Sequence, residues 1–119
     1  MSAAILKQKD GVAYLFFDSD MQKSLKATNG YIKQSYTLKG ETLDDIAKAM
    51  GVKADVLKQT MADWKKGKDA KKDAFGRADM PRDLATGPFY AIVVTPAVHH
   101  TMGGIKIDSK TQVYDQKAT

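Results

Sequence analysis

Two continuous apolar segments near opposite ends of the chain restrict its fold more than any other feature of the sequence. One runs from Val12 to Phe17 and the other runs from Phe89 to Val94. Short apolar runs that are rich in aromatic and β-branched residues predict buried β-strands. The residues between the two runs carry helical patterns. The sequence therefore predicts a small α+β domain with short, mainly antiparallel strands.

The middle of the chain predicts a helix pair, for which a tight antiparallel arrangement is the simplest packing. The first helix begins at Thr42, whose hydroxyl can cap the first turn together with Asp45, and it ends at Gly51. The second helix runs from about Ala54 to Lys66 and ends at Gly67. Both helices have an apolar face, formed in the first by Leu43, Ile46, Ala47 and Met50 and in the second by Leu57, Met61 and Trp64.

Three shorter elements are expected around this pair. A short helix is predicted from Met21 to about Lys26, and Asn29-Gly30 ends it. Residues 31–38 read as a loop or a short strand. Residues 105–108 alternate between apolar and polar side chains, which predicts a half-exposed strand.

The composition is that of one soluble globular domain or of part of a larger one. Of the 119 residues, 43% are hydrophobic and 28% are charged, so the chain is able to bury a core. It contains no cysteine, which excludes disulfides, thiolate zinc sites and a cysteine nucleophile. No apolar stretch approaches the roughly 20 residues of a membrane span, and the N-terminus lacks the pattern of a signal peptide. We therefore expect either a cytosolic protein or a piece of a longer precursor.

The formal net charge of +5 arises from lysine, because 17 of the 19 basic residues are Lys. Sites for nucleic acid and phosphate favour Arg for its bidentate geometry. The Lys-rich segment 65–77 has only Trp64 and Phe75 nearby as aromatic residues, and stacking on nucleic-acid bases requires more. We expect this segment to be a solvated connection. The alternative is a stand-alone small basic binding protein that uses the segment 65–77.

The only two histidines, His99 and His100, are adjacent and are followed closely by Gly103 and Gly104. Neighbouring side chains on an extended backbone point in opposite directions, and no third ligand stands at a suitable spacing, so no metal site is predicted. Two interpretations stay open. Each histidine is a structural residue, or one of them binds an anion or a carbonyl beside a glycine pair that permits close approach of a flat ligand.

The same part of the chain resembles a known family through its motifs, which are Gly87-Pro88-Phe89-Tyr90-Ala91, Thr95-Pro96, His99-His100-Thr101-Met102-Gly103-Gly104 and Ile107-Asp108. These motifs resemble the soluble, flavocytochrome c-type fumarate reductase flavoproteins, within the succinate dehydrogenase/fumarate reductase flavoprotein superfamily. The helix that begins Thr42-Leu43-Asp44-Asp45 is similar to the helical part of that family. The resemblance extends over almost the whole chain.

The resemblance implies that residues 1–119 are the capping domain of a larger FAD-dependent reductase from a bacterium, located in the periplasm or the cytoplasm. Residues 89–119 would include the strand that leads back to the missing FAD-binding domain. In such enzymes a hydride passes from FAD to an activated alkene, such as fumarate or a related unsaturated carboxylate, and an arginine supplies the proton. That arginine is expected upstream of Ser2. We therefore expect no catalytic residue in this fragment, and no activity from the fragment alone.

The resemblance also assigns roles within the run of histidines and glycines. His99 is expected to bind a substrate carboxylate, and the residues expected along FAD are His100, Thr101, Met102, Gly103 and Gly104. FAD is expected in the full-length parent but not on the fragment, because the chain lacks the glycine turn that cradles phosphates. The expected partners are the missing FAD-binding domain and the unsaturated carboxylate, without nucleic acid or a membrane span.

An excised domain and a stand-alone protein should differ in how much apolar surface they expose. The segment from Ser2 to Leu6 looks like core, which is unusual at the start of a complete protein. An excised capping domain should leave uncovered the face that meets flavin. We therefore expect Phe89, Tyr90 or Met102 to line an exposed apolar patch.

Overall fold

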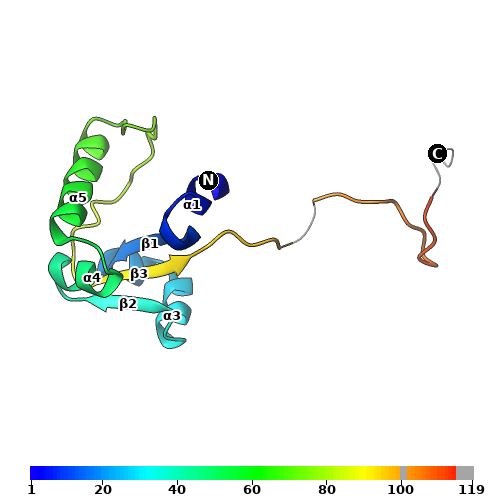
Figure 1. The fold of residues 1–119 in the computed structure, drawn as a ribbon, viewed down its shortest axis with the longest axis horizontal. Coiled ribbons are helices and arrows are strands. Elements are labelled where there is room, and N and C mark those ends of the chain that lie inside the picture. The colour runs from blue at the N-terminus through cyan, green and yellow to red at the C-terminus, as the bar shows by residue number, and fades with distance from the viewer. Residues whose placement is uncertain (100–101, 115–119) are drawn as a thin grey trace.

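The structure, a computed structural model, describes residues 1–99 and 102–114 and combines a small antiparallel sheet with helices (Figure 1). This arrangement confirms the predicted α+β class. In chain order the elements are α1 (Ser2–Leu6), the 3₁₀-helix η1 (Lys9–Gly11), β1 (Ala13–Asp18), α2 (Ser19–Ser24), α3 (Lys26–Lys33), β2 (Thr37–Gly40), α4 (Leu43–Met50), α5 (Ala54–Asp69) and β3 (Phe89–Val94).

The last strand, β3, occupies the centre of the sheet, whose order is β1-β3-β2. Both neighbours are antiparallel to it, and Phe89 lies opposite both Asp18 of β1 and Gly40 of β2. The two apolar runs at opposite ends of the chain are therefore adjacent strands. Both strands predicted from the sequence are confirmed.

The hydrophobic core lies between one face of this sheet and the helix pair α4 and α5. Its buried members are Ile46, Ala47, Leu57, Phe89 and Ala91. The strand β2 approaches α4 very closely at Gly40, where a Cβ atom would lie 2.3 Å from the backbone nitrogen of Ile46. Only glycine fits at this position, so the packing of α4 on the sheet depends on it.

The predicted capping box at the start of α4 is confirmed. The Thr42 hydroxyl oxygen accepts a hydrogen bond from the backbone N–H of Asp45 at 3.2 Å, and the Asp45 carboxylate accepts one from the backbone N–H of Thr42 at 3.0 Å. The Thr42 hydroxyl and backbone N–H hold the pKa of Asp45 below its ordinary value. Gly51 follows the helix with a left-handed φ of 69°, as expected of a glycine at a helix end.

Two predicted helix ends are wrong. The dipeptide Asn29-Gly30 lies inside α3, because the chain bends earlier, at Leu25, where the Thr28 hydroxyl donates to the carbonyl oxygen of Gln22 at 3.1 Å. Gly67 lies inside α5, which continues to Asp69. A Cβ atom on Gly67 would lie 2.9 Å from the Cβ of Asp73, so this glycine permits helix–loop packing instead of ending the helix.

Three expectations near the ends of the chain also need correction. The helix α1 has no buried residue, so the start of the chain is not core. Residues 105–108 form no strand, and only Ile107 makes a single bridge, to Val113. Phe89 and Tyr90 are 6% and 7% exposed because β3 is the central strand, whereas Met102 is 93% exposed. Of the expected apolar patch, only Met102 is uncovered.

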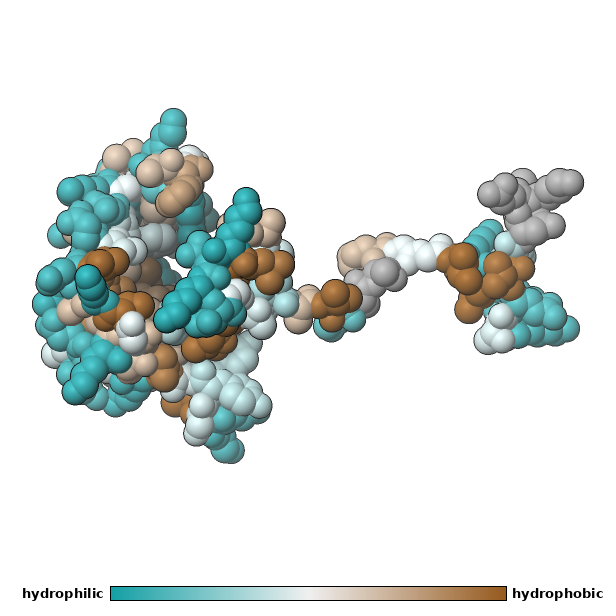
Figure 2. Space-filling view, in the orientation of Figure 1, coloured by the Kyte–Doolittle hydropathy of each residue, from teal (hydrophilic) through white to brown (hydrophobic). Residues whose placement is uncertain are grey.

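Beyond β3 the chain leaves the compact domain (Figure 1). We call the described residues 95–99 and 102–114 the C-terminal extension. Figure 2 shows strongly apolar residues along this extension as well as on the domain. The segment that carries the predicted site therefore lies outside the core that the domain forms for itself.

Candidate functional site

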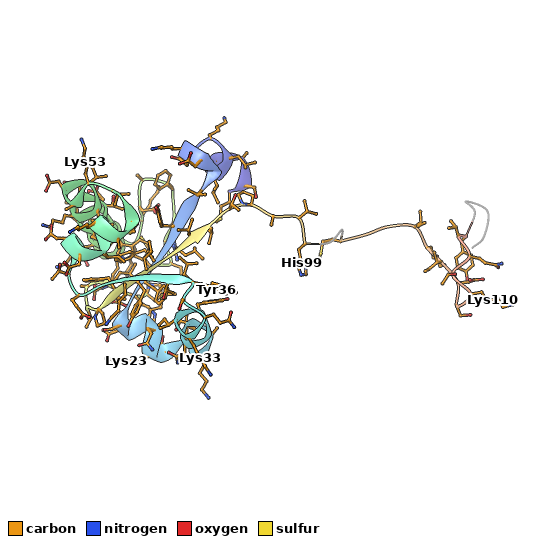
Figure 3. The ribbon with its side chains drawn as sticks, turned by 60° about the horizontal axis from the view of Figure 1, so that its bottom comes forward. Lys23, Lys33, Tyr36, Lys53, His99 and Lys110 are labelled. Atoms are coloured by element: carbon orange, nitrogen blue, oxygen red, sulfur yellow. The ribbon has the colours of Figure 1, made fainter. Side chains whose placement is uncertain are left out.

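The predicted substrate-binding residue, His99, lies in the C-terminal extension, five residues after the end of β3. The start of the extension is held against the domain, because the Thr95 hydroxyl donates a hydrogen bond to the carbonyl oxygen of Gly11 at 2.9 Å. The side chain of His99 is exposed and stands away from the domain (Figure 3). The fold thus places this imidazole where a partner surface or a ligand is able to reach it.

The residues expected along FAD follow His99 directly. His100 and Thr101 lie outside the described residues. Met102 is 93% exposed, and a Cβ atom at Gly103 or Gly104 would have no atom within 4 Å apart from those of the adjacent residues. These three residues have open space around them, and the glycine pair leaves the backbone accessible to a flat ligand.

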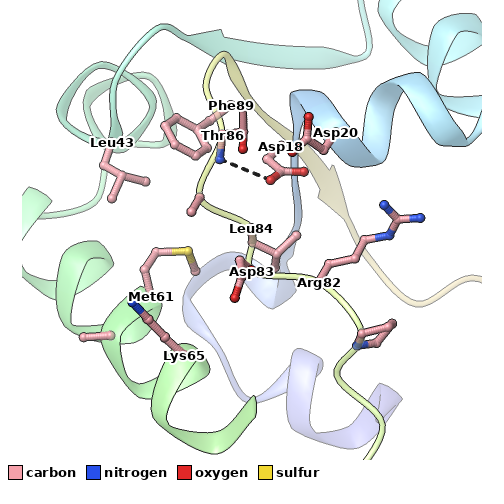
Figure 4. A pocket seen from close by; sticks show the side chains of 13 residues that line it. Asp18, Asp20, Leu43, Met61, Lys65, Arg82, Asp83, Leu84, Thr86 and Phe89 are labelled. Atoms are coloured by element: carbon pink, nitrogen blue, oxygen red, sulfur yellow. Dashed lines mark hydrogen bonds between the residues drawn. The ribbon is translucent and has the colours of Figure 1, made fainter. Parts of the chain in front are cut away.

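A cavity of about 760 Å³ lies at the opposite end of β3, between α5, the loop 81–86 and the start of α2 (Figure 4). Its carboxylate Asp18 is buried and already has partners: one oxygen accepts from the backbone N–H of Met21 at 2.9 Å, and the other accepts from that of Thr86 at 3.3 Å. Asp18 therefore caps α2 and fixes the loop that leads into β3.

This cavity and His99 are separate regions of the molecule. Phe89, the first residue of β3, lines the cavity, and the extension begins after Val94, the last residue of the strand. A strand of this length spans roughly 20 Å. The sequence does not reveal this cavity, because residues far apart in the chain line it. The one local signal is the capping chemistry of Asp18.

The charges along the Lys-rich segment are partly neutralised by neighbouring carboxylates. Lys68 pairs with Asp83, which raises the pKa of Lys68 and lowers that of Asp83 through their hydrogen bond. Lys66 lies 3.8 Å from the carboxylate of Asp63. These pairs tie the segment to its own helix and to the following loop.

Of the two aromatic residues near this segment, Trp64 is engaged within the domain, whereas Phe75 is 96% exposed. The indole N–H of Trp64 donates to the carbonyl oxygen of Arg82 at 2.8 Å, and the guanidinium of Arg77 lies 5.1 Å from the centre of the indole ring. Trp64 therefore holds the loop after α5 against the helix. These contacts give Trp64 a structural role, which removes it from the alternative of a binding surface at 65–77.

Within residues 1–99 and 102–114, no group of three or more histidine or acidic side chains is placed to hold a metal ion. No helix in this part of the chain is both long and apolar enough to cross a membrane.

Comparison with known proteins decides the family. The family described as FAD binding domain matches residues 2–119, almost the entire chain. The chain belongs to this FAD binding domain family. FAD is thus the cofactor of the family, as expected from the resemblance of the motifs.

Two curated relatives illustrate the range of the family. A probable fumarate reductase of Shewanella frigidimarina is 41% identical over 118 residues, which cover 96% of this chain and 20% of the relative. A urocanate reductase of Eggerthella lenta is 31% identical over 126 residues, which cover 99% of this chain and 21% of the relative. The chain therefore spans about a fifth of the length of these relatives.

Two solved structures share the fold. The open conformation of a flavocytochrome c3 fumarate reductase matches with a TM-score of 0.83 and 40% identity, over 98% of this chain and 21% of that chain. A fumarate reductase flavoprotein subunit from Lactobacillus plantarum, solved by solution NMR, matches with a TM-score of 0.64 and 26% identity, over 86% of this chain and 74% of that one. The resemblance to fumarate reductase flavoproteins is confirmed.

The described residues have the properties of a surface against which FAD could lie, and they do not form a pocket that encloses it. Gly103 and Gly104 leave room for the flat ring system to approach the backbone. The 760 Å³ cavity is no dedicated site for the diphosphate of FAD, because its wall carries three carboxylates, Asp18, Asp20 and Asp83, against two basic side chains, Lys65 and Arg82. The described residues therefore do not enclose a site for FAD by themselves.

Proposed function

We propose that residues 1–119 form the capping domain of a longer FAD-dependent reductase that reduces an activated alkene, fumarate or a related unsaturated carboxylate. Residues 89–119 lead from β3 back to the FAD-binding domain of that protein. The observation that carries this proposal is the exposed position of His99 and of the residues 102–104, directly after the central strand of a folded domain. The names of the relatives, fumarate reductase and urocanate reductase, support an unsaturated carboxylate as the substrate class.

His99 binds the carboxylate of this substrate in the proposed mechanism. Its imidazole N–H donates a hydrogen bond to a carboxylate oxygen, and that bond strengthens when the capping domain closes and water leaves, because the local dielectric falls. Holding the carboxylate fixes the position of the double bond. When bound, FAD supplies the hydride that reduces this bond. The proton comes from an arginine that the family resemblance places upstream of Ser2.

The residues after His99 position the cofactor. His100, through its backbone, and Thr101 would contact FAD when it is bound, and Met102 would pack its side chain on the ring system. Gly103 and Gly104 allow the backbone to lie close to the flat ring, because a side chain at either position would keep the two apart. This arrangement gives the apolar side chain of Met102 a partner surface.

The proposal predicts that the isolated chain binds no flavin and has no reductase activity. The phosphates of FAD bind at a glycine turn that precedes a helix, and this chain lacks such a turn. The residues of the extension alone should therefore not hold the cofactor. The purified chain should be colourless, without the flavin absorption band. A stoichiometric flavin band in the purified chain would contradict the proposed division between the two domains.

The proposed FAD contact is tested by the same substitution at two glycines in the longer flavoprotein. Gly104→Leu inserts a bulky side chain where the backbone should face the ring. Gly30→Leu is the matched control, because Gly30 lies in α3 with no other atom within 4 Å of its Cβ position. We expect Gly104→Leu to weaken FAD binding by about tenfold or more, a loss of about 1.4 kcal/mol, and Gly30→Leu to leave it unchanged. Full flavin occupancy in Gly104→Leu, measured by absorbance after dilution, would contradict the assignment.

A further inference from the structure

The two edge strands of the sheet, β1 and β2, differ strongly in how well they are protected against pairing with a further strand. The strand β2 has four residues and includes Lys39, and short length and lysine are both features that discourage pairing with another strand. The strand β1 has six residues, contains no lysine or proline, and pairs with β3 in an unbroken register from Ala13 to Asp18. Only β2 therefore has the properties of a natural sheet edge.

The side chains of β1 are apolar on both faces, as in a strand from the interior of a sheet. On one face, Tyr14 and Phe16 pack against the core. On the other face, Phe17 is 3% exposed, and its ring stacks on that of Tyr90 with the centroids 5.2 Å apart. Leu15 lies on the same face as Phe17 but is 58% exposed, so the burial of this face stops partway along the strand.

The outer side of β1 has no backbone partner in the part of the chain that the structure describes. Within residues 1–99 and 102–114, the backbone groups of β1 bond only to β3. The helix α1, which precedes it, has no buried residue and makes no backbone hydrogen bond to β1. A row of alternate N–H and C=O groups therefore faces outward from an apolar strand.

We propose that an extended segment of the longer flavoprotein, from outside residues 1–119, adds to β1 as a fourth strand of this sheet. This inference rests on the proposed function, which places the chain in a longer protein. About four fifths of the length of the relatives lies outside the matched region, so such a segment is available within the same polypeptide. The added strand places an apolar side chain beside Leu15, because residues opposite each other in a sheet share a face.

Amide hydrogen exchange measured by mass spectrometry tests this proposal in two samples, the isolated chain and the longer flavoprotein. The outward amides of β1 should exchange about 100-fold more slowly in the longer protein, whereas those of β2 should change by less than about threefold. Unchanged exchange in β1 of a longer protein that binds FAD and reduces its substrate overturns the added strand and leaves the proposed function standing. Equal slowing in β1 and β2 also overturns it, since that result reports general stabilisation.

Hydrogen exchange also distinguishes a segment of the same polypeptide from a second copy of the chain as the partner of β1. Slow exchange in β1 of the isolated chain that becomes faster on dilution would assign the edge to a second copy, and this overturns the proposal. A substitution gives independent evidence: Leu15→Lys should raise the exchange rate of β1 about tenfold in the longer protein and leave the isolated chain unchanged. Tyr36→Lys, at a residue 62% exposed outside β1, is the matched control and should have no effect in either sample.

Discussion

The compact domain and the C-terminal extension contain similar apolar side chains but expose them to very different extents. Ile46 in the domain has no exposed surface, whereas Ile105 in the extension is 74% exposed. The other large apolar residues of the extension are exposed as well, namely Val98, Met102, Ile107, Val113 and Tyr114. The domain buries a core of its own, although it leaves Leu15 and Phe75 exposed, whereas the extension buries none of its described large apolar side chains. This contrast is the pattern expected where a chain passes from one folded unit to a surface formed by another.

The largest effect that the contrast predicts concerns equivalent isoleucines in the two regions. Ile46→Ala leaves a cavity in the core, so the free energy of unfolding of the isolated chain should fall by about 2–5 kcal/mol. Ile105→Ala removes a side chain that already contacts solvent, so stability should change by less than about 0.5 kcal/mol. Urea denaturation of both variants measures this difference. Equal losses would show that the extension belongs to the cooperative core.

A second pair of substitutions tests close packing in the same two regions. Gly40→Ala places a methyl group against the backbone of Ile46, where it would lie 2.3 Å from the nitrogen, so α4 must move away from the sheet. We expect a loss of about 1–3 kcal/mol in unfolding free energy. Within the described residues, the methyl group of Gly103→Ala meets no atom within 4 Å apart from those of the adjacent residues, so the isolated chain should be unchanged. A neutral Gly40→Ala variant would contradict the observed contact between β2 and α4.

A smaller effect follows from the capping box of α4. Hydrogen bonds from Thr42 lower the pKa of Asp45 in the folded chain from its ordinary value of 3.8. A carboxyl with a lowered folded pKa stabilises the protein above its unfolded pKa, and this contribution is lost as the pH falls through the folded value. Between about pH 5 and pH 2, Asp45→Asn should therefore lose less stability than the parent chain. Parallel thermal melts across this range check the prediction, and identical pH profiles would contradict it.

The strands and the helix pair could be predicted because their signals are local in the sequence. Apolar runs identify β1 and β3, and the four residues from Thr42 to Asp45 contain the whole capping box. The role of Gly67 could not be predicted, since it depends on a contact with Asp73 in the following loop. The burial of Phe89 and Tyr90 depends on the position of β3 in the sheet, which a strand's own sequence does not specify.

The roles proposed for the candidate site come only from the resemblance of its motifs. The residues alone left His99 as either a structural residue or an anion ligand, because two adjacent histidines and two glycines have no unique geometry. The cavity beside Asp18 gave no such signal, since its hydrogen bond to Thr86 joins positions 68 residues apart. Local sequence patterns thus predict helices and strands, whereas contacts between residues distant in sequence determine where these elements form a cavity.

Steady-state kinetics of the longer flavoprotein, with fumarate as the first substrate, tests most directly whether the extension carries the substrate site. His99→Ala should raise KM by about 10- to 150-fold, the equivalent of about 1.5–3 kcal/mol for one charged hydrogen bond. The loss in kcat should be smaller, because another residue donates the proton. His100→Ala is the adjacent control and should leave KM nearly unchanged. A raised KM in His100→Ala with no change in His99→Ala would contradict the assignment of substrate binding to His99.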